Sequence, residues 1–127
     1  MSSHLQKQLQ ALGQPEVRGM LTGIKRGIEK ESLRIEAKGT LAQTPHPAGL
    51  GSALTHSLIT TDYSEALLEF ITPVNTSMEG SLQLLEDIHS FVYQKIGDEI
   101  LWSASMPCIM SGDANIPVAQ YGSSNVA

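Results

Sequence analysis

Two short segments carry acidic residues that could do chemistry, and the first is Glu29-Lys30-Glu31. In a strand, residues two apart share a face, so these carboxylates would lie about 6.5–7 Å apart along the chain. Leu33 and Ile35 would continue that face, and two carboxylates on an apolar face repel each other and resist burial. Mg²⁺ would relieve both problems, because it prefers carboxylate oxygens and keeps waters and phosphate oxygens as further ligands. The alternative, which the spacing alone favours, is that Glu-Lys-Glu simply faces solvent.

The second segment contains Asp62 and Glu69. Glu69 lies among Leu, Phe and Ile, where a carboxylate needs a partner or a metal ion. A structural ion pair with Arg26 or Arg34 is the equally weighted alternative, and Asp62 alone is more typical of a turn or cap. If the carboxylates of both segments faced one another, they would form an all-oxygen site for two or more Mg²⁺ ions. Such ions stabilise charge during phosphoryl transfer.

Other chemistries have weaker support. His46 and His56 lack the i, i+4 partner of a zinc motif, and Cys108 has no CxxC partner. We expect Cys108 to be a small buried residue rather than a nucleophile. No P-loop or Rossmann glycine pattern is present, so a nucleotide would have to bind in another way.

Strands must position the carboxylates. Residues 23–35 alternate in polarity, which predicts a strand with Glu29 and Glu31 on one face. Residues 64–72 have apolar residues in both alternating sets, which predicts an interior strand covered on both faces. A helix is the competing interpretation there, but Pro73 and the β-branched end favour a strand.

Helices and loops should surround these strands. Leu5, Leu9 and Leu12 predict a short amphipathic helix, and Thr76 with Glu79 forms a capping box at the start of a longer one. The apolar stripe of that longer helix comprises Met78, Leu82, Leu85, Ile88, Val92 and Ile96, and Gly97 follows as a left-handed cap. The remaining predictions are a turn at 37–39, a long loop at 39–61 with a helical turn near Ser52, short strands at 100–102 and 116–120, and a turn-rich tail at 121–125.

Composition narrows the class of protein. The chain has 127 residues, which suits one domain or part of one, and 41% hydrophobic content is typical of a globular protein. Its net charge of −5 and scattered basic residues argue against a nucleic-acid partner. No apolar run approaches the roughly 20 residues that span a bilayer, and the polar start lacks a signal core. We therefore expect no membrane partner and a cytoplasmic location.

Several strings resemble the proteobacterial type of glutamate–cysteine ligase. They occur in the family's order, which makes the match far more specific than Glu-x-Glu alone. The similar stretches are 23–35, 39–42, 46–47, 50–56, 59–74, 96–99, 101–102, 105–108 and 119–125.

The resemblance implies a fold and an activity. The fold would be α+β, part of a glutamine-synthetase-like antiparallel sheet with flanking helices. The enzyme would phosphorylate the γ-carboxylate of L-glutamate with ATP, and the amine of L-cysteine would then attack the acyl phosphate. The product would be γ-glutamylcysteine, in the first step of glutathione biosynthesis. Mg²⁺, or alternatively Mn²⁺, would be the cofactor, and the full-length enzyme would be a monomer.

The resemblance also assigns residues. It implies that Glu29, Glu31, Asp62 and Glu69 serve the metal site, with no catalytic residue beyond them. Asp62 and Tyr63 would contact substrate, since Tyr63 occupies a position near the cysteine pocket where the family often has Phe. Residues that bind the nucleotide are not assigned.

The same resemblance suggests that residues 1–127 are the N-terminal portion of a single catalytic domain, with a helical lead-in at 1–22. We expect such a piece alone to bind Mg²⁺ weakly and not to turn over. The alternatives are a small non-catalytic binding domain, or a related carboxylate–amine ligase with a different amine substrate.

Overall fold

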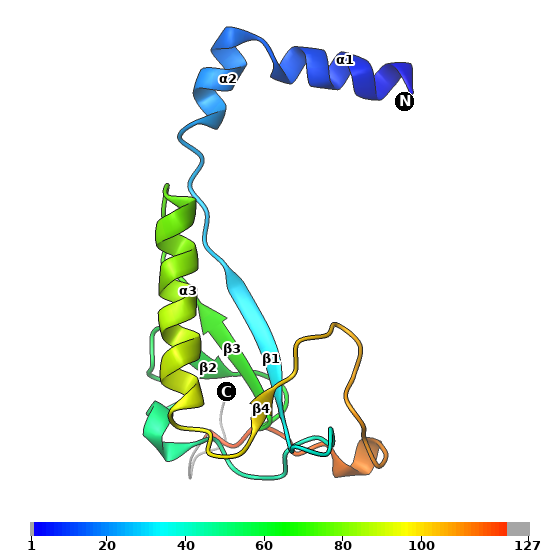
Figure 1. Ribbon diagram of the computed structural model, residues 1–127, viewed down its shortest axis with the longest axis vertical. Helices are drawn as coiled ribbons and strands as arrows, with labels where there is room; N and C mark the ends of the chain where they lie inside the picture. Colours follow the sequence, from blue (N-terminus) through cyan, green and yellow to red (C-terminus); the bar gives the residue numbers. More distant parts are fainter. Residues whose placement is uncertain (1, 122–127) are drawn as a thin grey trace.

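An antiparallel sheet lies at the centre of the computed structural model, which describes residues 2–121 (Figure 1). The strand order is β2-β3-β1-β4, with β1 at Glu29–Ile35, β2 at Ile59–Thr61, β3 at Leu67–Ile71 and β4 at Ile100–Leu101. The helices are α1 (Ser3–Leu12), α2 (Pro15–Leu21) and α3 (Met78–Tyr93), with short 3₁₀ helices η1 (Ala48–Leu50) and η2 (Asp113–Asn115). All neighbouring strands are antiparallel. The α+β class with an antiparallel sheet is therefore confirmed.

The two strands predicted from alternation both form, and each is shorter than predicted. β3 is an interior strand between β2 and β1, as expected for 64–72. β1 begins at Glu29, because the Ile28 N–H donates to the Thr72 side-chain hydroxyl at 2.8 Å and not to a strand carbonyl, and Arg26 before it makes an isolated bridge. The short strand expected at 100–102 is confirmed as β4.

One face of the sheet is buried beneath α3, and the other is not. Leu68 and Phe70 of β3 are both 0% exposed, whereas Leu67, Glu69 and Ile71 on the other face are only half-buried. The expectation that both faces of β3 are covered is therefore wrong for the described residues. The main core gathers Leu50, Ile59, Leu68, Phe70, Ile88, Val92, Ile96 and Leu101.

α3 starts one residue later than its predicted capping box. Ser77 is the N-cap, and its hydroxyl accepts from the Gly80 N–H at 3.0 Å. Thr76 is not the cap, because Asn75 Oδ1 already accepts from the Ser77 N–H and fixes the turn there. The Ser77 hydroxyl lies 3.3 Å from the Glu79 carboxylate, so Glu79 contacts the helix cap as predicted, but the cap is Ser77 and not Thr76.

The buried stripe of α3 is also rotated at its start. Ser81 is 2% exposed and faces the sheet, whereas Met78 and Leu82 are 56% and 58% exposed. Further along, Ile88 and Val92 are buried as predicted. Gly97 has φ of 63°, so the predicted left-handed position after the helix is confirmed.

A second, smaller core lies under the loops beyond β1. Its buried residues are Ile35, Leu41, Ala42, Ala66 and Cys108, with Leu33, Trp102 and Ile116 packed against it. Cys108 is therefore a small buried residue, as expected.

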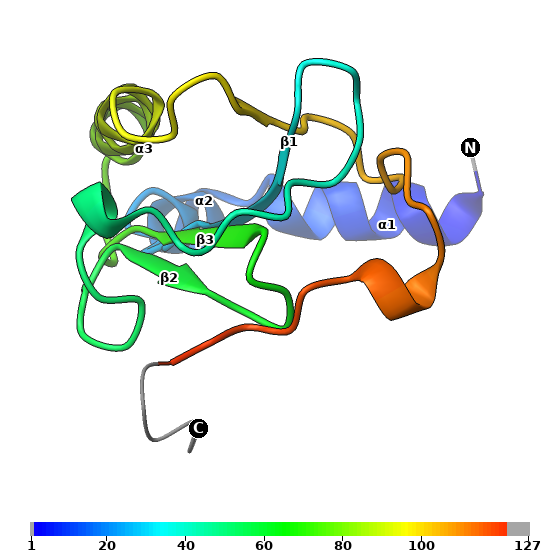
Figure 2. The same cartoon turned by 90° about the horizontal axis from the view of Figure 1, so that it is seen from below.

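The N-terminal helices extend away from the sheet (Figures 1 and 2). Neither helix has a buried residue. The helix predicted from Leu5, Leu9 and Leu12 is confirmed as α1, and Pro15 is the first residue of α2, where its missing N–H has no cost. None of the described helices is long and apolar enough to cross a membrane.

The predicted strand at 116–120 is wrong, because only Val118 forms a bridge, with Ser64. Instead η2 precedes this stretch. The loop predicted for 39–61 contains η1 and ends in β2, a strand that was not predicted. Most of the tail predicted at 121–125 lies outside the described residues.

Candidate active site

Glu31 of β1 and Glu69 of β3 lie directly opposite each other in the sheet. Three residues beyond this pair on each side, the Thr72 N–H donates to the Ile28 carbonyl at 2.9 Å, so Ile28 and Thr72 are a hydrogen-bonded pair. Because antiparallel pairs alternate in type, Glu31 and Glu69 form a non-hydrogen-bonded pair, with Cα atoms about 4.5 Å apart and side chains close together. Glu29 lies two residues from Glu31 and shares its face.

β2 brings Asp62 to the same side of the sheet. Thr60 pairs with Glu69 across the strands, and Asp62 follows two residues later, just beyond the end of β2. The pKa of Glu69 is raised, first by partial burial and then by the negative charges of Glu29, Asp62 and Glu31. The structure therefore places the acidic residues predicted from the sequence around Glu69. We call this side of the sheet, with Glu29, Glu31, Asp62 and Glu69, the acidic face.

No ion pair within residues 2–121 neutralises the acidic face. The ion pairs there join Arg34 to Glu99 at 2.6 Å and Lys38 to Glu36 at 2.7 Å. Arg34 was one alternative partner for Glu69, but it is fully buried and lies on the opposite face of β1. Its guanidinium also donates to the carbonyl of Glu65 at 2.9 Å. A structural ion pair therefore does not explain Glu69.

Lys30, between the two glutamates in sequence, does not compensate them either. Strand alternation places its side chain on the opposite face, where Nζ donates to the Ser32 hydroxyl and lies 5.7 Å from the centre of the Phe70 ring. Partial burial lowers the pKa of Lys30. The Glu-Lys-Glu segment is thus divided between two different environments.

The donors of the acidic face suit a hard divalent cation in type. They are carboxylate oxygens without a basic partner in the described chain, and Mg²⁺ takes such ligands together with waters and phosphate oxygens. However, no three His, Cys, Asp or Glu side chains of residues 2–121 come together closely enough to form a metal site by themselves. The magnesium site therefore stays a prediction, in which these residues supply part of the ligand set.

A cavity of about 460 Å³ adjoins the acidic face at Glu31. Its apolar wall includes Leu33, Leu67 and Trp102, and the loop after β4 closes one side through Met106. The indole N–H of Trp102 donates to the Met106 carbonyl at 2.6 Å, which fixes that loop. A ligand with a positively charged group would fit here, with that group at Glu31 and an apolar substituent in the cavity.

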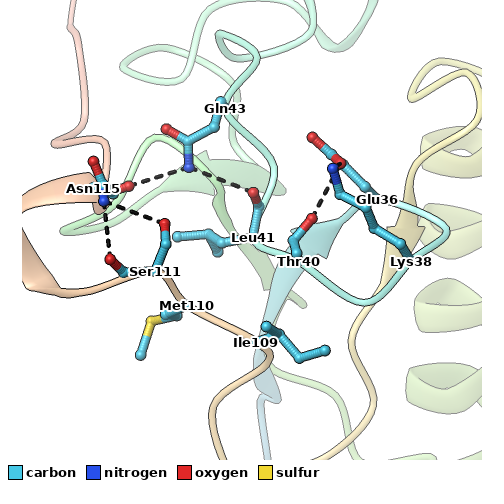
Figure 3. Close-up of a pocket in the computed structure, with 9 residues that line it drawn as sticks. All are labelled: Glu36, Lys38, Thr40, Leu41, Gln43, Ile109, Met110, Ser111 and Asn115. Atoms are coloured by element: carbon cyan, nitrogen blue, oxygen red, sulfur yellow. Dashed lines mark hydrogen bonds and ion pairs between the residues drawn. The ribbon is translucent and has the colours of Figure 1, made fainter.

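A separate cavity of about 350 Å³ lies between the turn after β1 and the segment before η2 (Figure 3). Figure 3 shows Glu36 with Lys38 and Thr40 on one side and Asn115 on the other. The lysine and threonine hydrogen bonds lower the pKa of Glu36. None of the residues of the acidic face lines this cavity. It is therefore not part of the candidate site.

Tyr63, the predicted substrate contact, is 72% exposed beside Asp62. The sequence analysis did not predict the roles of three neighbours of these residues. Thr60 pairs with Glu69 across the strands, the Glu65 carboxylate accepts from the Gln120 N–H, and the Tyr121 hydroxyl donates to the Thr61 and Asp62 carbonyls. The β-branched run at 59–61 was the available signal for the strand that carries Thr60. Nothing in the sequence pattern pointed to the contacts of Glu65 or Tyr121.

Comparisons with known proteins agree with these motifs. The family model described as "Glutamate-cysteine ligase" matches residues 9–127. The glutamate–cysteine ligase of Alcanivorax borkumensis is 61% identical over 123 residues, which cover 97% of this chain and 23% of that protein. That of Azotobacter vinelandii is 52% identical over 126 residues, covering 99% and 24%. The chain thus spans about a quarter of the length of these relatives.

Two solved structures share the fold. The glutamate–cysteine ligase of Francisella tularensis in complex with AMP has a TM-score of 0.75 at 42% identity, covering 80% of this chain and 20% of that one. A bifunctional glutathione synthetase from Pasteurella multocida also has a TM-score of 0.75, at 37% identity, with 81% and 14% covered. With a family match over nearly the whole sequence and a shared fold around the acidic strands, the chain belongs to the glutamate–cysteine ligase family.

Proposed function

We propose that this chain supplies the acidic, cation-binding part of the active site of an ATP-dependent glutamate–cysteine ligase. The observation that carries the proposal is the opposition of Glu31 and Glu69 on a half-open sheet face, with Glu29 and Asp62 beside them. Within the described chain no ion pair neutralises any of these residues. The AMP complex of the Francisella relative supports a nucleotide as co-substrate.

The acidic face cannot receive these substrates unaided, because ATP and glutamate are both anions. Mg²⁺, or Mn²⁺ in its place, would neutralise the phosphates and the charge that develops during phosphoryl transfer. Glu29, Glu31, Asp62 and Glu69 would hold the cation and thereby fix where the phosphates lie. Partial burial is the first cause of the raised pKa of Glu69, and the negative charges of Glu29, Asp62 and Glu31 raise it further, so a cation beside them would relieve their repulsion.

The proposed reaction has two steps. A γ-carboxylate oxygen of L-glutamate attacks the γ-phosphorus of ATP, ADP leaves, and an acyl phosphate forms. The amine of L-cysteine then attacks the acyl carbon, inorganic phosphate leaves, and the amine loses a proton as the amide forms. Asp62 and the exposed ring of Tyr63 would contact the cysteine. In this proposal the working enzyme is a cytoplasmic monomer that starts glutathione biosynthesis.

The experiment uses a chimaera in which residues 9–127 replace the matching segment of the Alcanivorax ligase. We expect glutamate- and cysteine-dependent ADP release from the chimaera, because 61% identity should preserve the contacts of the segment. Glu29→Gln and Glu69→Gln should abolish most of that activity without loss of fold. Glu86→Gln, on the exposed side of α3, is the matched control and should leave activity unchanged.

Other results would exclude the proposal. Full activity in both acidic-face variants would favour the non-catalytic binding domain. Activity with another amine in preference to cysteine would favour a related ligase. The 127-residue chain by itself should release no ADP, and turnover by that chain would refute the expectation that it is catalytically incomplete.

A further inference from the structure

The segment from Pro117 to Tyr121 runs alongside the chain that carries Asp62. Figure 2 shows it passing on the side of the sheet away from α3. The Glu65 N–H donates to the Pro117 carbonyl at 2.8 Å, and the Ala119 N–H donates to the Tyr63 carbonyl at 3.1 Å. The two stretches are therefore held together on both sides of Ser64, which bridges to the segment at Val118.

A buried carboxylate strengthens this junction. Glu65 is 5% exposed, and its two oxygens accept from different parts of the chain. One accepts from the His46 N–H at 2.8 Å, and the other accepts from the Gln120 N–H at 2.6 Å. Hydrogen bonds of this kind to an ionised acceptor are stronger than neutral ones, so Glu65 ties the segment firmly to the end of β2.

Tyr121 makes the contact nearest to the acidic face. Its hydroxyl lies 3.1 Å from the Thr61 carbonyl and 3.1 Å from the Asp62 carbonyl, and donates its single hydrogen between them. In an extended strand, successive carbonyls point in opposite directions. Both can reach one hydroxyl only because the backbone bends as it leaves β2, at the residue whose carboxylate contributes to the acidic face.

We propose that Tyr121 is a positioning residue, whose hydroxyl holds the bend after β2 so that the Asp62 carboxylate faces Glu69. This inference rests on the proposed function, because it assigns Tyr121 a part in cation binding through Asp62. Loss of the hydroxyl frees two adjacent carbonyls and lets the bend relax. A net hydrogen bond of ordinary strength corresponds to an increase of about three- to tenfold in the half-saturating Mg²⁺ concentration.

The test compares two identical substitutions in the chimaera. Tyr121→Phe removes the hydroxyl at the bend and keeps the ring. Tyr93→Phe is the matched control, because the Tyr93 hydroxyl also bonds to a backbone group, the Leu101 N–H at 3.3 Å, on α3 rather than at the acidic face. Both variants should lower Tm slightly, but only Tyr121→Phe should raise the Mg²⁺ concentration needed for half-maximal ADP release.

An equal Mg²⁺ dependence in the two variants would overturn the inference, because a purely structural hydroxyl would lower Tm alone. Inactivity of the unsubstituted chimaera would instead overturn the proposed function, and the inference with it. The activity of the unsubstituted chimaera therefore distinguishes the two failures.

Discussion

Glu69→Gln should stabilise the metal-free chain, although it removes an ionisable group from the candidate site. Glu69 lies opposite Glu31, with Glu29 and Asp62 nearby, and like charges directly opposed in a sheet are destabilising by about 0.2–1 kcal/mol. Glutamine keeps the size of the side chain and removes its charge. With more than one carboxylate nearby, we expect a gain of about 0.5–1 kcal/mol, or a rise in Tm of about 2–4 °C for a chain of this length.

Magnesium should reverse this order. A cation that binds only the folded chain stabilises it by RT ln(1 + [L]/Kd), about 1.4 kcal/mol at ten times Kd. The neutral amide of Glu69→Gln is a poorer ligand, so the variant should gain much less from Mg²⁺ than the wild type does. At high Mg²⁺ the wild-type chain should therefore become the more stable of the two.

The assay is thermal unfolding followed by circular dichroism, with EDTA and then with excess MgCl₂. Glu86→Gln removes one exposed charge from α3 and should shift stability by less than about 0.5 kcal/mol in either condition. A lower Tm for Glu69→Gln in EDTA would refute the reasoning, because it would mean that a partner stabilises the carboxylate. An equal Mg²⁺ effect on all three proteins would indicate general screening instead of binding.

Three further outcomes follow from the structure. Burial and neighbouring carboxylates raise the pKa of Glu69 above 4.5, so the folded metal-free chain binds this proton more tightly than the unfolded chain does. The folded chain therefore loses stability as the pH rises from the unfolded pKa of Glu69 through its raised folded pKa. The difference in Tm between Glu69→Gln and the wild type should be widest at neutral pH and should disappear in acid. Ser77→Ala should cost about 1 kcal/mol in urea unfolding, whereas Thr76→Ala should cost almost nothing, and equal costs would contradict the assigned cap. Arg34→Lys should lower the free energy of unfolding by about 3 kcal/mol or more in the same assay, because it leaves buried acceptors unpaired. The control Arg18→Lys, on exposed α2, should have no effect. A mild effect of Arg34→Lys would refute the structural role of Arg34.

Much of the acidic face could be predicted from local pattern. Glu29 and Glu31 share a face because strands have a period of two, and the alternation around Glu69 assigned it to the side opposite Leu68 and Phe70. Those assignments needed no knowledge of the partner strand. The direct opposition of Glu31 and Glu69 did need it, because register depends on which two strands pair and where the chain between them turns back.

The errors also have local causes. β2 is only three residues long, which is too short for alternation to be visible in the sequence. The helix cap is Ser77 and not the predicted Thr76, because the Asn75 side chain accepts a hydrogen bond from the Ser77 N–H and fixes the turn there.

By itself the sequence determined the family, the antiparallel strands and the identity of the acidic residues, since these follow from residue type and spacing along the chain. Only the tertiary structure decided that Arg34 pairs with Glu99 and not with Glu69, and that Tyr121 reaches back to the bend at Asp62. These contacts join residues more than fifty positions apart, and hydrogen-bond partners at such separations are chosen by the path of the folded chain, which no local periodicity encodes.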